Sequence, residues 1–156
     1  MHVPFKLPRE DSLREISFGM RRRRVHRRAP GQPGELCMLA GLAQAGPIQI
    51  ELIQPLTTGP IGYRDTVKKG ETKFHHVCVW TDDLDADLNY YNEKGFMTAN
   101  QGTVAAMDVR FAYVDTHAEL GCMIEILEHN DMVEELFKTI ADASSNWDGK
   151  DPIRYF

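Results

Sequence analysis

Two pairs of histidine and glutamate recur in this chain at the same spacing. His2 and Glu51 lie 49 residues apart, His76 and Glu125 also lie 49 residues apart, and the second pair follows the first at an offset of 74. Imidazole nitrogen and carboxylate oxygen together suit divalent ions such as Zn, Ni, Co, Mn or Fe. Two glutamates balance the charge of one such ion, so the spacing predicts a single metal site formed by all four side chains.

Both glutamates lie in apolar runs that are typical of strands. Residues two apart on a strand share a face, so Glu51 in the run 49–53 and Glu125 in the run 123–127 each share a face with residues that look interior. A carboxylate on such a face is costly unless a cation, a hydrogen-bond network or a proton satisfies it. A single His or Glu on a strand is more often structural than a ligand, so the repeated spacing is what favours a metal.

His75 is the alternative to His76 as the second histidine of the site. Strand alternation is expected to put these neighbours on opposite faces, and the match of His2-Val3 with His76-Val77 favours His76. The other histidines show no such spacing, and we expect them in loops, at element ends or in poorly defined positions: His26, His117 and His129.

The offset of 74 is close to half of the 156 residues, so the chain is predicted to contain two similar modules. In the second module, residues 74–80 alternate as a strand, and Asp82-Asp83 caps a helix that Gly95 ends. Leu84, Leu88 and Tyr91 share one face of that helix. Three further strands are predicted at 96–104, 109–114 and 121–127, and residues 100–102 and 115–117 offer turn chemistry between or beside them.

The first module is predicted to follow the same β-α-β-β-β order. We expect a strand over 1–7, a helix over 9–18 ended by Gly19, and further strands over about 20–28, 35–43 and 48–54, with an exposed loop at 30–34. These patterns predict an α+β fold of one compact domain built from two β-α-β-β-β modules.

Four segments divide the chain in this interpretation. Residues 1–54 form the first, arginine-rich module, 55–72 a linker with a short helical turn at 63–67, 73–128 the second module, and 129–156 a C-terminal helix and tail. The helix is predicted over about 132–143 because four apolar residues recur there at helical spacing: Val133, Leu136, Phe137 and Ile140.

Composition excludes several classes of protein. With 42% hydrophobic and 26% charged residues the chain is neither disordered nor a disulfide-stapled miniprotein. No run reaches the roughly 20 apolar residues of a membrane helix, and the first residues show no export signal, so we expect a cytoplasmic protein with no membrane partner. The chain has three cysteines, an odd number, and no two of them have a CxxC spacing. Neither a disulfide framework nor a thiolate zinc site is therefore indicated, and we expect buried thiols at Cys37, Cys78 and Cys122.

An arginine run interrupts an otherwise acidic chain. Six of the 18 basic residues fall between Arg21 and Arg28, while 23 acidic residues bring the net charge to −5. The run is expected to be a solvated strand or loop, or else to bind a phosphate-bearing small molecule. A nucleic-acid partner is disfavoured, because no aromatic residue interleaves the arginines and the rest of the chain repels a polyanion.

Several segments of the second half resemble the vicinal oxygen chelate superfamily. They are residues 50–55, the Phe74-His75-His76-Val77 string, residues 81–86 and residues 124–126, and the resemblance covers about 47–128. That superfamily includes glyoxalases, bleomycin resistance proteins, extradiol dioxygenases and methylmalonyl-CoA epimerases. The resemblance implies paired β-α-β-β-β modules that form a curled mixed sheet around a metal cleft with one divalent ion, commonly in a homodimer.

The family's four ligand positions fall on His2, Glu51, His76 and Glu125. This order resembles lactoylglutathione lyases, whereas the residues around His76 and the linker resemble methylmalonyl-CoA epimerases. The additional catalytic glutamate of the epimerases has no secure counterpart, Glu35 being the nearest carboxylate.

The resemblance implies a metal-dependent isomerase, epimerase or lyase. Such an enzyme moves a proton next to a metal-polarised carbonyl of a small substrate, with thioesters among the candidates. We expect Glu125 to move the proton and Glu51 to be its partner base. The alternatives are a metal-free protein that sequesters a ligand, and an extradiol-type dioxygenase. Candidate cleft residues, whose direction the sequence leaves open, are Met107, Arg110, Phe111 and Tyr113.

Overall fold

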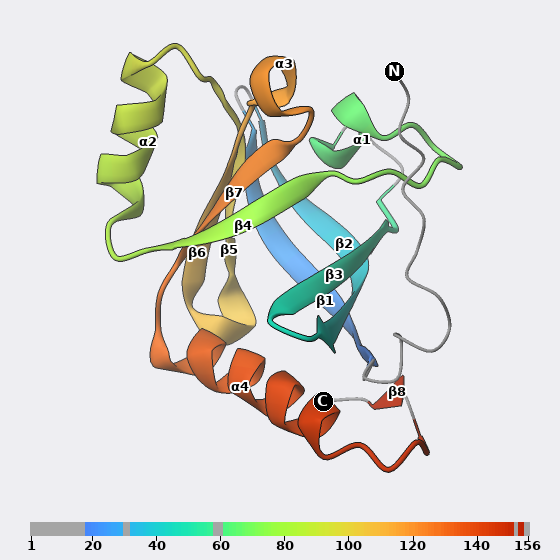
Figure 1. Cartoon of the computed structure of the whole chain (residues 1–156). Helices are drawn as coiled ribbons and strands as arrows, with labels where there is room; N and C mark the ends of the chain where they lie inside the picture. Colours follow the sequence, from blue (N-terminus) through green and yellow to red (C-terminus); the bar gives the residue numbers. More distant parts are fainter. Residues whose placement is uncertain (1–17, 30–31, 58–60, 152, 155–156) are drawn as a thin grey trace.

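The computed structural model describes residues 18–29, 32–57, 61–151 and 153–154 (Figure 1). Strands dominate the chain, and short helices connect or flank them. The elements in chain order are β1 (Phe18–Ala29), β2 (Gln32–Ala45), β3 (Ile48–Pro55), α1 (Tyr63–Thr66), β4 (His76–Thr81), α2 (Leu84–Glu93), β5 (Thr98–Val104), η2 (Ala105–Met107), β6 (Val109–Val114), α3 (His117–Leu120), β7 (Met123–Glu128), α4 (Asp131–Ser145) and β8 (Ile153–Arg154).

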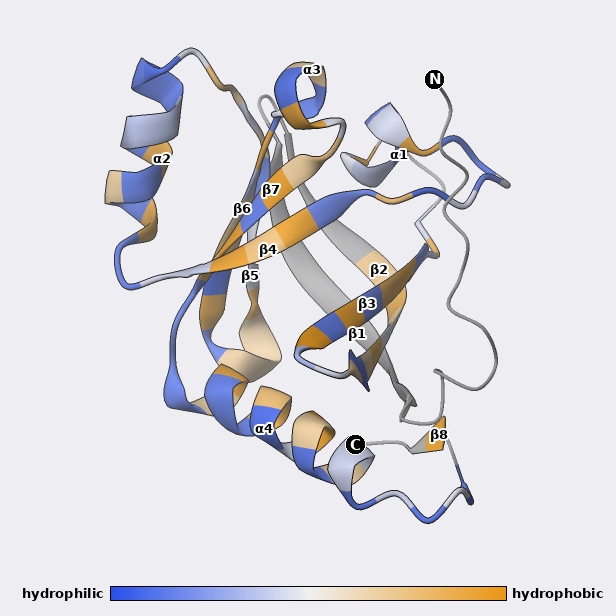
Figure 2. Ribbon diagram, viewed as in Figure 1, coloured by the Kyte–Doolittle hydropathy of each residue, from blue (hydrophilic) through white to orange (hydrophobic). Residues whose placement is uncertain are grey.

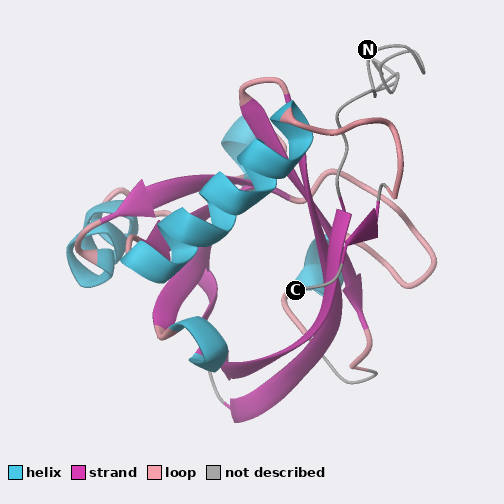
Figure 3. Cartoon of the chain, turned by 90° about the horizontal axis from the view of Figure 1, so that it is seen from below, coloured by secondary structure: helices cyan, strands magenta, loops and turns pink. Residues whose placement is uncertain are grey.

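The strands form one mixed sheet in the order β3-β2-β1-β5-β6-β7-β4, and β8 pairs with β1. Neighbours are antiparallel except for the pairs β4–β7 and β1–β8. Viewed from below, the sheet curls around an interior and α4 lies across its near end (Figure 3). The chain therefore has the predicted α+β fold with a curled mixed sheet and a C-terminal helix.

The second half has the predicted order, β4-α2-β5-β6-β7. The Asp83 side chain accepts a hydrogen bond from the Ala86 backbone N–H and so caps α2, as predicted. Gly95 follows the helix at φ +91°, a conformation that favours glycine. The strand predicted over 96–104 is confirmed as β5, and residues 100–102 form no turn, because they pair with β6 inside it.

The first half contains a β1–β2–β3 meander. The predicted strand over about 20–28 is confirmed as part of β1. The loop expected at 30–34 is shorter than predicted, since Pro33 and Gly34 already pair with β1. Phe18 and Gly19 are strand residues, because β8 and β2 supply backbone partners for them, so the predicted helix does not reach them. The rest of that helix and the predicted strand over 1–7 lie outside the described residues.

Two apolar layers form on opposite sides of the sheet. Outside it, Leu84 and Leu88 of α2 pack on β6 and β7. Inside it, α4 closes one end, and Figure 2 shows its hydrophobic side toward the strands. The buried residues of the inner layer are Met38, Ile61, Tyr63, Val104, Val109, Phe111, Tyr113, Met123, Leu127 and Val133.

The candidate cleft residues divide between these layers. Phe111 and Tyr113 face the interior, and Met107 packs against it from η2. Arg110 instead points outward, where its guanidinium binds the carboxylates of Asp85 and Glu128.

The helix expected over about 132–143 is confirmed as the longer α4, whose N-terminus is capped by the Asn130 side chain. The short helical turn expected at 63–67 is confirmed as α1. The division of the chain at residues 55–72 and 129 stays a prediction. Among the described residues, no helix has the length and apolar character needed to cross a membrane.

The cysteines differ from one another in burial. Cys122 is buried as predicted, whereas Cys37 is half-buried and Cys78 is exposed. Cys78 lies on β4, which is an edge of the described sheet, and an edge strand has a neighbour on one side only. The prediction that all three thiols are buried is therefore wrong.

Candidate metal centre

Three of the four predicted ligands converge inside the curled sheet. Glu51 comes from β3, His76 from β4 and Glu125 from β7, and one potential ligand atom of each lies within 4.8 Å of the others. His76 Nε2 is 3.2 Å from Glu125 Oε2 and 3.6 Å from Glu51 Oε2. His2 lies outside the described residues. The structure thus brings together an imidazole and two carboxylates that are far apart in the sequence.

Strand alternation explains why Glu51 faces inward. Along β3, exposed residues alternate with half-buried ones, and Glu51 belongs to the half-buried set. It pairs with Leu42 of β2, which is buried. The opposite set points outward and is exposed, and its apolar members are Ile48, Ile50 and Leu52.

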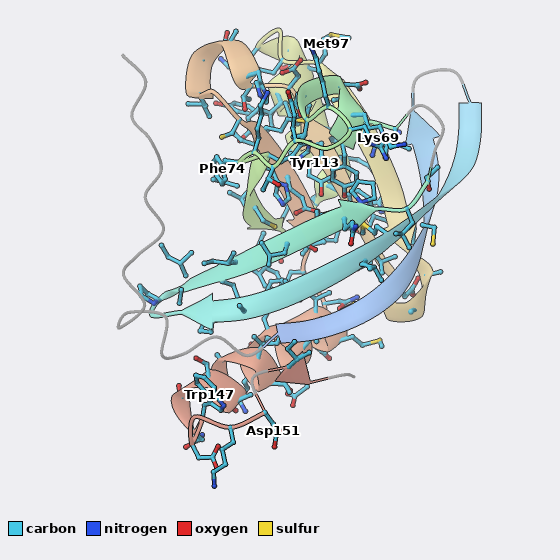
Figure 4. The ribbon with its side chains drawn as sticks, turned by 90° about the vertical axis from the view of Figure 1, so that its right-hand side faces the viewer. Lys69, Phe74, Met97, Tyr113, Trp147 and Asp151 are labelled. Carbon is cyan, nitrogen blue, oxygen red and sulfur yellow. The ribbon has the colours of Figure 1, made fainter. Side chains whose placement is uncertain are left out.

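The register of the second half explains the position of Glu125. It pairs with Cys78 of β4 on one side and Tyr113 of β6 on the other, so its carboxylate lies on the interior face. Glu125 is only 9% exposed, and Tyr113 beside it is 2% exposed. In Figure 4 Tyr113 lies among the interior side chains, whereas Phe74 lies at the periphery.

The two carboxylates determine the charge of His76. Burial opposes its protonation, but the adjacent carboxylates of Glu125 and Glu51 outweigh this effect and raise the pKa of His76 to about 9. In the metal-free site the protonated imidazole is therefore the cation between two carboxylates. A divalent ion held by the same nitrogen and carboxylate oxygens would replace this proton, and this donor set fits such an ion.

His75 lies beside the site, contrary to the prediction that it faces away. Its Nδ1 is 3.0 Å from His76 Nδ1, and its ring contacts those of Tyr63 and Tyr113. The prediction fails because β4 begins at His76, so strand alternation does not extend to His75. Burial lowers the pKa of His75 to about 4, and the neighbouring His76 adds to this effect.

Tyr63 is a further site neighbour that sequence reasoning missed. Its hydroxyl is 3.0 Å from that of Tyr113, and both side chains are buried. Burial, followed by the charges of nearby carboxylates, raises the pKa of Tyr113 well above its ordinary value. No spacing rule connects Tyr63 with Tyr113, since it comes from the short helix α1 in the segment expected to be a linker.

The far end of the interior is closed by α4. The Gln49 side-chain amide donates a hydrogen bond of 3.0 Å to the Phe137 carbonyl. The Trp80 and Phe137 rings meet edge to face at 5.1 Å between centroids. These contacts tie β3 and β4, which provide Glu51 and His76, to one helix.

Comparison with known proteins identifies the family. The model of the Glyoxalase/Bleomycin resistance protein/Dioxygenase superfamily matches residues 10–113, about two thirds of the chain. The chain therefore belongs to that superfamily.

A solved structure of a glyoxalase family protein from Bacillus cereus is similar at 16% sequence identity and a TM-score of 0.34. That match covers 78% of this chain and 87% of the other. A search of curated proteins finds no significant match.

Proposed function

We propose that the protein is a divalent-metal-dependent isomerase, epimerase or lyase that moves a proton next to a substrate carbonyl. One observation supports this choice within the superfamily, namely that Glu51, His76 and Glu125 bring their ligand atoms within 4.8 Å of one another. A protein that only sequesters a ligand has no need of two carboxylates directed at one buried imidazole.

The metal would be held by these three side chains. His2 is proposed as the fourth ligand because its spacing to Glu51 repeats that of His76 to Glu125. When bound, a divalent cation polarises the substrate carbonyl and makes the neighbouring carbon more acidic. Three or four protein ligands leave room for substrate or water at the remaining positions.

Glu125 is proposed to take and return the proton. Its carboxylate is nearly enclosed and lies beside the Tyr113 ring, so it has few competing water contacts. Glu51 is the second carboxylate and approaches the same nitrogen, His76 Nε2, from β3. Two carboxylates on different strands can serve two positions of a small substrate, as an isomerisation requires.

Deuterium exchange at the carbon next to the carbonyl tests this proposal. Protein loaded with Ni, Co, Mn, Zn or Fe is incubated in heavy water with 2-oxo thioesters and hemithioacetals, and label uptake is followed by NMR. We expect exchange with the wild type and a loss of about 10²–10⁴-fold in Glu125→Gln. The matched control is Glu128→Gln, the same change on the same strand at a residue that pairs with Arg110 instead.

Two results would contradict the proposal. Exchange at the wild-type rate in Glu125→Gln would remove the assigned role of that residue. No exchange with any metal, together with tight binding of an apolar ligand, would favour the sequestering alternative. The buried aromatic side chains beside the site, Tyr63 and Tyr113, are what such a ligand would contact.

The homodimer remains part of the proposal. The exposed apolar residues Ile48, Ile50 and Leu52 support it, since a second chain could cover them. The dioxygenase alternative has less support, because the described part of the site offers one imidazole and two carboxylates, whereas the resemblance gives that class two histidines and one glutamate.

A further inference from the structure

We infer that His75 is a positioning residue, whose Nδ1 accepts a hydrogen bond from His76 Nδ1–H and so presents His76 Nε2 to the metal. This inference rests on the proposed function, since it concerns how the same site is prepared for its ion. It assigns a role to a histidine that strand alternation had separated from the site.

The contact between the two rings fixes where the protons lie. The Nδ1 atoms are 3.0 Å apart, so one nitrogen must donate and the other accept. His76 Nε2 faces the Glu51 and Glu125 carboxylates, and it binds a metal through a free electron pair. A metal-bound His76 therefore holds its proton on Nδ1, which makes His75 Nδ1 the acceptor.

No competing acceptor for His76 Nδ1 is found among the described residues. Metal-binding histidines generally donate their second ring N–H to an acceptor, which fixes the tautomer and the ring plane. The acceptor is commonly a carboxylate or a backbone carbonyl. Here both nearby carboxylates lie at Nε2 of His76, so the His75 imidazole is the acceptor at Nδ1.

The surroundings of His75 hold its ring in place. Its centroid lies 5.0 Å from that of Tyr63 and 5.4 Å from that of Tyr113, with the three rings inclined to one another. The His75 backbone carbonyl accepts a hydrogen bond of 2.9 Å from the Met123 N–H, which connects it to the start of β7. An acceptor fixed in this way orients His76 at little further cost in side-chain entropy.

The acceptor role leaves the His75 proton on Nε2. That atom is buried and has no hydrogen-bond partner among the described residues. An unsatisfied buried N–H destabilises the fold, so a histidine at this position is not the best choice for stability alone. This cost is consistent with a residue retained for its effect on His76.

Three variants separate positioning from packing. His75→Phe keeps a ring of similar size and removes the acceptor. His75→Asn retains an acceptor, since its side-chain oxygen falls near the place of the imidazole Nδ1. His129→Phe is the control, a histidine that contacts Trp80 and lies outside the metal centre. Zn²⁺ affinity is measured by competition with a chelator, and thermal unfolding of each metal-free variant checks the fold.

A second readout observes the hydrogen bond itself. In ¹⁵N-histidine-labelled protein, a scalar coupling between the two Nδ1 nuclei reports an N–H···N bond, with and without Zn²⁺. We expect the coupling in the wild type, a 10–100-fold loss of Zn²⁺ affinity in His75→Phe, and recovery of most of it in His75→Asn. His129→Phe should bind Zn²⁺ as the wild type does.

Contrary results are separable from failure of the proposed function. If the wild type binds Zn²⁺ and His75→Phe binds it equally well, or if no coupling is seen, the positioning role is wrong and the metal site stands. If the wild type binds none of the metals, the proposed function is wrong. The role of His75 in metal binding is then wrong as well, even if the coupling is observed.

Discussion

β3 and β7 occupy matching places in the two halves and differ mainly on their outer faces. Each directs one glutamate, Glu51 or Glu125, at the same histidine. Behind Glu125, Ile126 is fully buried under α2. Behind Glu51, Leu52 is 53% exposed, and within the described part of the chain no helix corresponding to α2 lies on it. Each half therefore directs a carboxylate at His76, but the two halves differ in how the outer face of the strand is covered.

This difference indicates which constraints act on each face. The inner face must bring two carboxylates to one imidazole, and an error of about 1 Å there is costly to function. The outer face needs only enough apolar cover for stability, and a helix, a second chain or another segment can provide it. Changes that affect one half and not the other therefore separate function from stability.

The largest expected effect comes from exchanging the two carboxylates for amides. At saturating metal, Glu125→Gln should reduce turnover by about 10²–10⁴-fold, because it removes the proposed base. Glu51→Gln should act mainly on metal affinity and reduce turnover less. Steady-state kinetics over a range of metal concentrations distinguish the two. Equal losses of turnover at saturating metal would mean that the halves contribute equally to proton transfer.

Next in size is the pH dependence of metal binding, since His76 connects the two halves. Its pKa of about 9 means that a proton occupies Nε2, the proposed metal ligand, at neutral pH. Metal affinity should therefore rise about tenfold per pH unit from pH 7 to about 9 and then level off. In Glu51→Gln the plateau should begin at lower pH, because one of the two carboxylates that raise the pKa of His76 is lost. A flat profile in calorimetric titrations would contradict this.

The raised pKa of His76 also affects the stability of the metal-free protein. A raised histidine pKa adds stability below the ordinary value of 6.5, and this contribution is lost as the pH rises through about 9. The lowered pKa of His75 acts in the opposite sense below 6.5, where the unfolded chain takes up a proton that the fold does not. Metal-free protein should consequently lose stability between pH 7 and 9, as urea unfolding at several pH values can show.

The packing difference predicts a smaller, purely structural effect. Ile126→Ala should lower the free energy of unfolding by about 2–5 kcal/mol, because the Ile126 side chain on β7 is fully buried beneath α2. Leu52→Ala should cost less than about 1 kcal/mol on the exposed face of β3. Urea unfolding measures both. A cost for Leu52→Ala as large as that for Ile126→Ala would show that this face is covered in solution.

The smallest effect is expected at the outer surface of the second half. Arg110 binds the carboxylates of Asp85 and Glu128, and its side chain is 46% exposed. Arg110→Ala should change stability by less than about 1 kcal/mol, with a difference that shrinks as salt increases. A larger, salt-independent loss would assign this ion network a structural role.

Much of the second half could be predicted from local patterns. Asp83 and Gly95 bounded α2 correctly, and the apolar spacing around Val133 and Ile140 located α4. The site required a different argument, in which a repeated spacing joined Glu51 to His76 and Glu125 before any contact was known. These three side chains do converge, because inner-face residues in matching strands meet at one place. Their role as metal ligands, together with His2, stays a prediction.

The errors arose where a local rule did not apply. Alternation was extended to His75, although the strand begins one residue later, and turn chemistry was assigned to 100–102 inside β5. Tyr63 was missed because its approach to Tyr113 depends on the path of the connection between the halves. No local pattern describes that path. The burial of Cys78 was misjudged because the sequence does not reveal which strand is an edge.

The most direct test of a shared metal site is the metal content of purified protein by elemental mass spectrometry. After loading with Zn, Ni, Co, Mn or Fe and removal of excess, the wild type should hold about one ion per chain. His76→Ala should lose it, because the bridging imidazole is gone, while His129→Ala should retain it. No ion in the wild type with any of these metals, or equal content in His76→Ala, would contradict the account and leave Glu51 and Glu125 as structural carboxylates.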